Sequence, residues 1–136
     1  MPLYWTIDSR ERLMTAVADG GVQKNEAMAY LGAMIGAEAA GYRRLFDGSR
    51  GEALMNDDEI MELAVEIRRV QTLAAPGPLA IVMPREKFDQ FARVLGVLAV
   101  PRRPLQFFAD PETGRVWLDQ PEIRNWPGSS GEAGSP

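Results

Sequence analysis

The chain contains neither cysteine nor histidine. Without cysteine it can form no disulfide, no thiolate nucleophile and no thiolate metal site. Without histidine it lacks imidazole metal ligands, the base of a Ser-His-Asp triad and the usual switch near neutral pH. Any catalysis would therefore depend on carboxylates, lysines, arginines, tyrosines or a cofactor.

Long apolar runs and dense basic clusters are missing as well. No run of 18 apolar residues is present, and the first residues lack the layout of a signal peptide, so we expect a cytoplasmic protein. The net charge is −4, and the lack of a Lys/Arg cluster disfavours a nucleic-acid partner. No spacing matches a known metal loop or phosphate-binding loop, so we expect no metal and no cofactor.

What is present is the composition of an ordinary globular domain. The chain has 136 residues, of which 46% are hydrophobic and 25% are charged. This length suits one domain with a single core, which we expect over residues 1–119. Residues 120–136 are rich in Pro, Gly and Ser, and we expect a flexible tail there.

Two strands and a helix are expected in the first third of the chain. Alternation of polar and apolar side chains predicts strands over residues 3–8 and 12–18, joined as a hairpin. The run Asp19-Gly20-Gly21 is expected to end the second strand. A helix over residues 26–39 follows, with Asn25 as its expected cap.

A third strand over residues 42–47 leads to the most clearly marked helix. Asn56 is the expected cap of this helix, and Glu59 stands three residues later, where it can close a capping box. The acidic first turn suits the positive end of the helix dipole. Apolar residues at helical spacing predict the face that packs on the core: Ile60, Leu63, Ala64, Ile67 and Val70.

The remaining elements are less evenly marked. The apolar run 79–83 predicts a central strand buried on both faces. Pro84 is expected to begin another helix, and a strand is expected over residues 104–108. Residues 110–118 suit either a hairpin with a returning strand or a short helix capped by Asp110.

The order β-β-α-β-α-β-α-β, followed by a short α, predicts an α/β fold. Repeated strand-helix-strand units imply a mixed sheet of about five strands with helices packed against it. The junction between the third strand and its helix is expected at the carboxyl edge of the sheet. Folds of this kind usually place their working surface at that edge.

Several stretches of this order carry a family resemblance. They are Tyr4–Asp8, Tyr30-Leu31, the strand at 42–47, Pro78–Val82, and Phe107–Asp110 with Trp117-Leu118. Across about residues 3–119 they resemble the STAS superfamily, typified by anti-sigma-factor antagonists, and within it the small bacterial SpoIIAA-like proteins. The resemblance implies a non-enzymatic regulatory domain with a protein partner. It also favours the helix over the hairpin for 110–118, since that family closes with a helix.

The resemblance also concerns a phosphorylation site. Anti-sigma-factor antagonists carry an Asp-Ser pair at the start of the helix after the third strand, and a partner kinase phosphorylates that Ser. Here the matching place is Asn56-Asp57, so the resemblance implies no phosphoserine switch there. A carboxylate at a helix start partly imitates a phosphate, but it also stabilises a helix without any other role. Ser49 is the nearest hydroxyl, in a setting typical of a turn.

We expect a protein partner to dock at residues 47–58 and the start of the following helix. The candidate residues are Asp47, Gly48, Ser49, Asn56, Asp57 and Asp58. One alternative is a carrier for a small apolar or lipid-like ligand held between helices and sheet. Another is carboxylate chemistry or Mg²⁺ binding, if the acidic residues of this stretch converge. A homodimer formed through an edge strand or an apolar helix face is also open. Arg102-Arg103 is a small basic point that could contact an acidic partner or a lipid headgroup, although arginines in such a loop are more often simply solvated.

Overall fold

The structure is a computed structural model that describes residues 2–89, 92–93 and 103–126. Its strands form one sheet in the order β1-β2-β3-β4-β5. The strands are β1 (Leu3–Asp8), β2 (Leu13–Val22), β3 (Arg43–Ala53), β4 (Leu79–Val82) and β5 (Leu105–Phe108). β1 and β2 are antiparallel, and each later strand runs parallel to its neighbour. The expected mixed α/β sheet is confirmed.

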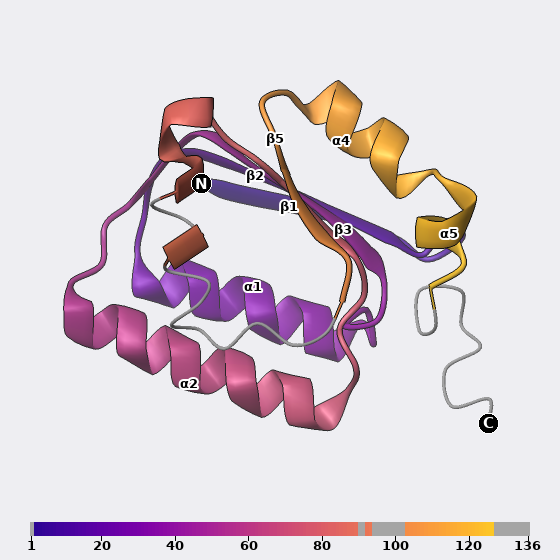
Figure 1. Ribbon diagram of the computed structural model, residues 1–136. Helices are drawn as coiled ribbons and strands as arrows, with labels where there is room; N and C mark the ends of the chain where they lie inside the picture. Colours follow the sequence, from indigo (N-terminus) through magenta and orange to yellow (C-terminus); the bar gives the residue numbers. More distant parts are fainter. Residues whose placement is uncertain (1, 90–91, 94–102, 127–136) are drawn as a thin grey trace.

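Helices cover both faces of the sheet (Figure 1). α1 (Lys24–Gly36) and α2 (Asp57–Leu73) lie side by side on one face, and α4 (Pro111–Leu118) and α5 (Pro121–Arg124) lie on the other. Because side chains alternate along a strand, each face has its own buried cluster. The α1/α2 face buries Met14, Ala16, Ala18, Tyr30, Leu31 and Met34, among others. The α4/α5 face buries Leu13, Leu45, Ala80, Val82, Leu118 and Ile123.

The expected ends of the second and third strands are wrong. β2 continues to Val22 instead of ending at residue 18, and β3 continues to Ala53 instead of ending at Asp47. After a register shift the two strands pair again, from Asp19 with Arg50 to Val22 with Ala53, so what was expected to be a loop before α2 is mostly strand.

Glycines explain this extension. Gly20 adopts a φ of +91°, next to a register shift in the β2–β3 pairing. A Cβ atom on Gly51 would lie 2.5 Å from the Cβ of Ala18. Gly20 and Gly51 therefore permit an irregular and close pairing of β2 with β3. From the sequence, Asp19-Gly20-Gly21 had indicated the end of the second strand.

The start of α2 is as expected. The Oδ1 atom of Asn56 accepts a hydrogen bond from the Glu59 backbone N at 2.8 Å, and Oε1 of Glu59 accepts from the Asn56 backbone N at 3.1 Å. α1 begins at Lys24 instead of residue 26, so its N-cap is Gln23 and the expected cap, Asn25, lies inside the helix. The backbone N of Gln23 donates to Oε1 of Glu26 at 2.9 Å.

The C-terminal part resolves the open alternative. Oδ1 of Asp110 accepts from the Thr113 backbone N at 2.9 Å and caps α4, so residues 110–118 contain the helix and not the hairpin. Within the stretch expected as a tail, α5 is helical and its Ile123 is buried; residues 127–136 lie outside the described residues. After β4 a short 3-10 turn, η1 (Arg85–Lys87), follows Pro84, and most of the helix expected there also lies outside the described residues.

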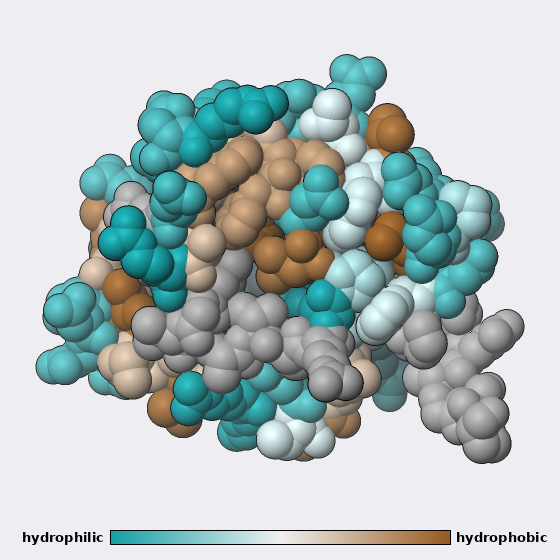
Figure 2. Space-filling model, viewed as in Figure 1, coloured by the Kyte–Doolittle hydropathy of each residue, from teal (hydrophilic) through white to brown (hydrophobic). Residues whose placement is uncertain are grey.

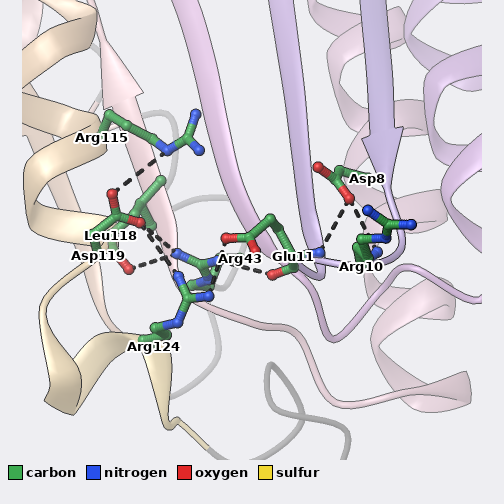
Figure 3. A network of polar contacts seen from close by, with 8 residues as sticks. All are labelled: Asp8, Arg10, Glu11, Arg43, Arg115, Leu118, Asp119 and Arg124. Atoms are coloured by element: carbon green, nitrogen blue, oxygen red, sulfur yellow. Dashed lines mark hydrogen bonds and ion pairs between the residues drawn. The ribbon is translucent and has the colours of Figure 1, made fainter.

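Arg43 connects a turn near the N-terminus with a helix near the C-terminus (Figure 3). Its side chain is 1% exposed on the α4/α5 face of β3. The guanidinium donates to the carbonyl oxygens of Leu118 at 2.9 Å and Glu11 at 2.8 Å, and to Oδ1 of Asp119 at 3.1 Å. It therefore ties β3 to the β1–β2 turn and to the end of α4. Across the described part of the chain, no helix has both the length and the apolarity needed to cross a bilayer.

Candidate functional site

The first group of candidate residues lies within β3. Asp47 is paired in register with Val82, the last residue of β4. Its Oδ1 accepts hydrogen bonds from the Ser49 backbone N at 3.0 Å and from the Ser49 Oγ at 2.6 Å. Gly48 lies between them, with the Phe46 ring 3.4 Å from where its Cβ would be. The Asp47 and Ser49 side chains therefore bond to each other beside the end of β4.

The second group begins α2. Asn56, Asp57 and Asp58 are all exposed. Beside them a surface hollow of about 440 Å³ lies where α1 and α2 both begin. Its lining residues are Gln23, Lys24, Asn25, Leu54 and Glu59. This end of the helix pair is therefore open to solvent and concave.

The two groups are not brought together. From Asp47 to Ala53 the chain stays extended as β3, and at roughly 3.3 Å per residue this separates the groups by about 20 Å along the strand. Asp47 thus does not converge with Asp57 and Asp58, which the carboxylate hypothesis required. Within the described ranges, no three acidic residues are grouped so as to hold a metal ion.

Around the start of α2 the structure adds apolar residues that we did not select from the sequence. Leu54 is 49% exposed, Met61 52% and Val65 62%. Asp57, Met61 and Val65 follow one another at intervals of four residues, so they share one face of the helix. Helical spacing could have identified Met61 and Val65, because both fall outside the core-facing stripe of α2.

Ion pairs occupy the boundary between α1 and α2. Lys24 of α1 pairs with Glu62 of α2, and the hydrogen bond and charge of Glu62 raise the pKa of Lys24. Farther along α2, the hydrogen bond from Arg69 lowers the pKa of Glu66. Asp57 and Asp58, in contrast, form no ion pair with any described residue. No described cation therefore neutralises these two carboxylates.

Comparison with known proteins yields fold matches only. No family model matches the chain, and no curated protein matches it. One similar solved structure is an uncharacterised protein of the DUF3478 family with a SpoIIAA-like fold, from Shewanella loihica PV-4. Its TM-score is 0.59 at 16% identity, with 85% of this chain and 93% of that chain covered.

A second similar structure is that of the anti-sigma factor antagonist SpoIIAA in its unphosphorylated form. Its TM-score is 0.54 at 12% identity, with 85% of this chain and 96% of that chain covered. The chain therefore has a SpoIIAA-like, STAS-type α/β fold, as the residue patterning indicated.

Proposed function

We propose that this protein is a non-enzymatic regulatory domain that binds a protein partner through the start of α2. The observation that carries the proposal is one exposed surface, which we name the α2 face: Leu54, Asp57, Asp58, Met61 and Val65. On it, carboxylates that pair with no described cation adjoin exposed apolar side chains. Apolar patches bordered by polar residues are typical of protein interaction sites.

The fold similarity to an anti-sigma factor antagonist supports this role. In the family resemblance, the residue at the phosphorylated position is Asp57. A carboxylate keeps its charge at neutral pH, whereas a serine gains charge only when it is modified. We therefore propose that the α2 face binds its partner with a constant negative charge and without a phosphoserine switch.

The experiment compares partner binding by three forms of the protein. The first is the wild type, and the second is Asp57→Asn with Asp58→Asn. The third is the matched control Glu112→Gln with Glu122→Gln, which removes the same charge from the exposed first turns of α4 and α5. A partner captured from the host is titrated against each form.

We expect the α2-face variant to bind roughly tenfold more weakly, because two interface charges contribute about 0.5–1 kcal/mol each. The loss should be larger at low salt, since the interaction is electrostatic. The control should bind like the wild type. Equal affinity of all three forms would refute docking at the α2 face.

A second candidate function is small-molecule carriage, which is favoured by a hollow of about 330 Å³ between α1 and α2. Its lining residues are Met28, Leu31, Gly32, Ile35, Glu66, Arg69 and Val70. The volume is at the small end of ligand pockets. It lies between two helices, whereas the expected pocket lay between helices and sheet.

Gly32 offers a direct test of carriage. A Cβ on Gly32 meets nothing within 4 Å, so Gly32→Leu can fill the hollow without a backbone clash. Gly36→Leu on the same helix is equally unobstructed and does not line the hollow. Native mass spectrometry should find a bound compound on the wild type and on Gly36→Leu but not on Gly32→Leu. A wild-type protein without any bound compound would remove this candidate.

A further inference from the structure

Arg44 is a buried cation on the α1/α2 face of the sheet. Its side chain is 8% exposed, and its register neighbours are Leu79 and, one strand farther, Leu105. The Nη1 atom donates to the sulfur of Met34 at 3.2 Å, and a thioether is a weak acceptor. The Nε atom is buried without any hydrogen-bond partner.

Arg103 is a second cation in the same setting. Contrary to the expectation of a solvated loop residue, it is only partly exposed, and its Nε atom is also buried without a partner. Its Nη1 donates to the Gly77 carbonyl oxygen at 3.3 Å. Burial lowers the pKa of Arg103 to about 9; the positive charge of Arg44 contributes to this shift, and Tyr30 opposes it. Because arginine stays protonated in proteins, the two positive charges coexist there.

No negative charge of the described residues accompanies this pair. Neither arginine forms an ion pair with a described residue. The stretches 90–91 and 94–102 contain no Asp or Glu, and Glu132 is the one acidic residue after position 126. Buried charges in proteins are normally paired, because an unpaired one is costly. Adjacent Arg43, with three strong acceptors, shows the usual arrangement.

We propose that Arg44 and Arg103 form a binding site for a small oxyanion, a phosphate or a carboxylate, which supplies the negative charge that the described residues do not provide there. Guanidinium groups bind both kinds of anion through two parallel hydrogen bonds. The surroundings strengthen the attraction, since charges interact more strongly in apolar settings.

The apolar setting is visible on the surface. Figure 2, seen from the same side as Figure 1, shows hydrophobic side chains gathered between η1 and β5. The buried cluster of this region comprises Leu79, Ile81 and Met83, packed against Phe46, Phe88, Leu105 and Phe107. Arg103 is partly exposed, so part of its side chain is accessible to an anion from solvent.

The test measures the melting temperature of the purified protein in sodium phosphate, sodium acetate and sodium chloride at equal ionic strength. Phosphate and acetate separate the two oxyanion chemistries, and chloride controls for screening. At tenfold saturation, binding should raise Tm by roughly 5 °C over chloride. Isothermal titration calorimetry with the better anion then gives its affinity directly.

Variants identify the residues responsible. Arg103→Met should remove the anion-dependent rise while keeping its Tm in chloride, because one of two repelling charges is gone. Arg103→Lys keeps the charge but loses the planar fork, and at least half of the rise should disappear. Arg50→Met is the control, since Arg50 is exposed and pairs with Asp19; it should keep the full rise.

Two results would overturn the site. One is a wild-type Tm that neither phosphate nor acetate raises above its value in chloride. The other is a rise that persists in both Arg103 variants. Because no partner protein is present, the outcome is independent of docking at the α2 face.

Discussion

Replacing Arg43 with Met should destabilise the protein by about 3 kcal/mol. Hydrogen bonds from a charged donor contribute about 1.5–3 kcal/mol each, and breaking them leaves acceptors unsatisfied. The Leu118 carbonyl bond is buried and should carry most of the loss. The Asp119 contact contributes less, because that carboxylate is 49% exposed and is screened by solvent.

This magnitude also includes an opposing effect. Met fills much of the space of the arginine stem and removes the cost of burying a charge, which can make such replacements neutral. We expect the loss to exceed this gain, because the two carbonyl groups keep their positions without a donor. For a chain of this length, 3 kcal/mol corresponds to a Tm decrease of about 10 °C.

Thermal and urea denaturation measure the change, and hydrogen exchange locates it at the end of α4 and in α5. The control is Arg115→Met, whose Nε lies 3.8 Å from the same Asp119 and whose side chain is 46% exposed. An exposed pair of this kind contributes about 0–1 kcal/mol, so Tm should change by about 3 °C at most. Equal stability of the Arg43 and Arg115 variants would show that the bonds from Arg43 to the β1–β2 turn and to the end of α4 do not stabilise the fold.

Three further predictions concern local features. Asn56→Ala should cost about 0.5–2 kcal/mol in urea unfolding because the α2 cap is lost, whereas Asn25→Ala should cost little. Gly77→Ala should cost at least about 1–3 kcal/mol in the same assay, since its Cβ would lie 2.3 Å from a backbone carbonyl oxygen. The pKa of Glu66 is lowered from 4.5 by its arginine partner, so this pair stabilises the fold above pH 4.5 and ceases to do so on further acidification. A pH series of Tm values should therefore show Glu66→Gln less stable than wild type at pH 6 and equal to it in strong acid.

Local chemistry decided which elements could be predicted. The start of α2 depends on Asn56 and Glu59, three residues apart, so short-range spacing contains all the information. The helix after Asp110 was predictable for the same reason, because its cap joins Asp110 and Thr113, which are also three residues apart. The length of β3 could not be predicted from local spacing, because the role of Gly51 depends on its close approach to Ala18 on another strand. That contact joins two strands and cannot be read from local spacing. The longer β3 separates Asp47 from Asp57 and Asp58, which the sequence suggested were neighbours.

The arginines show the same limit. Two adjacent charges in a strand are expected to reach water, yet Arg43 and Arg44 are buried on opposite faces of the sheet. Arg43 has acceptors from distant segments, whereas Arg44 has Arg103 near it and pairs with no carboxylate of the described residues. Neither environment can be found from local spacing. Of the proposed α2 face, the sequence suggested Asp57 and Asp58 but not its apolar residues.

Photo-crosslinking from two matched positions tests the proposed docking most directly. Val65 on α2 and Val116 on α4 are both 62% exposed, and their helices lie on opposite faces of the sheet (Figure 1). A photoreactive amino acid is placed at one position or the other in the protein expressed in its host. Docking at the α2 face predicts a crosslinked protein from position 65 and none from position 116. Crosslinking from position 116 alone, or from neither position, would contradict it.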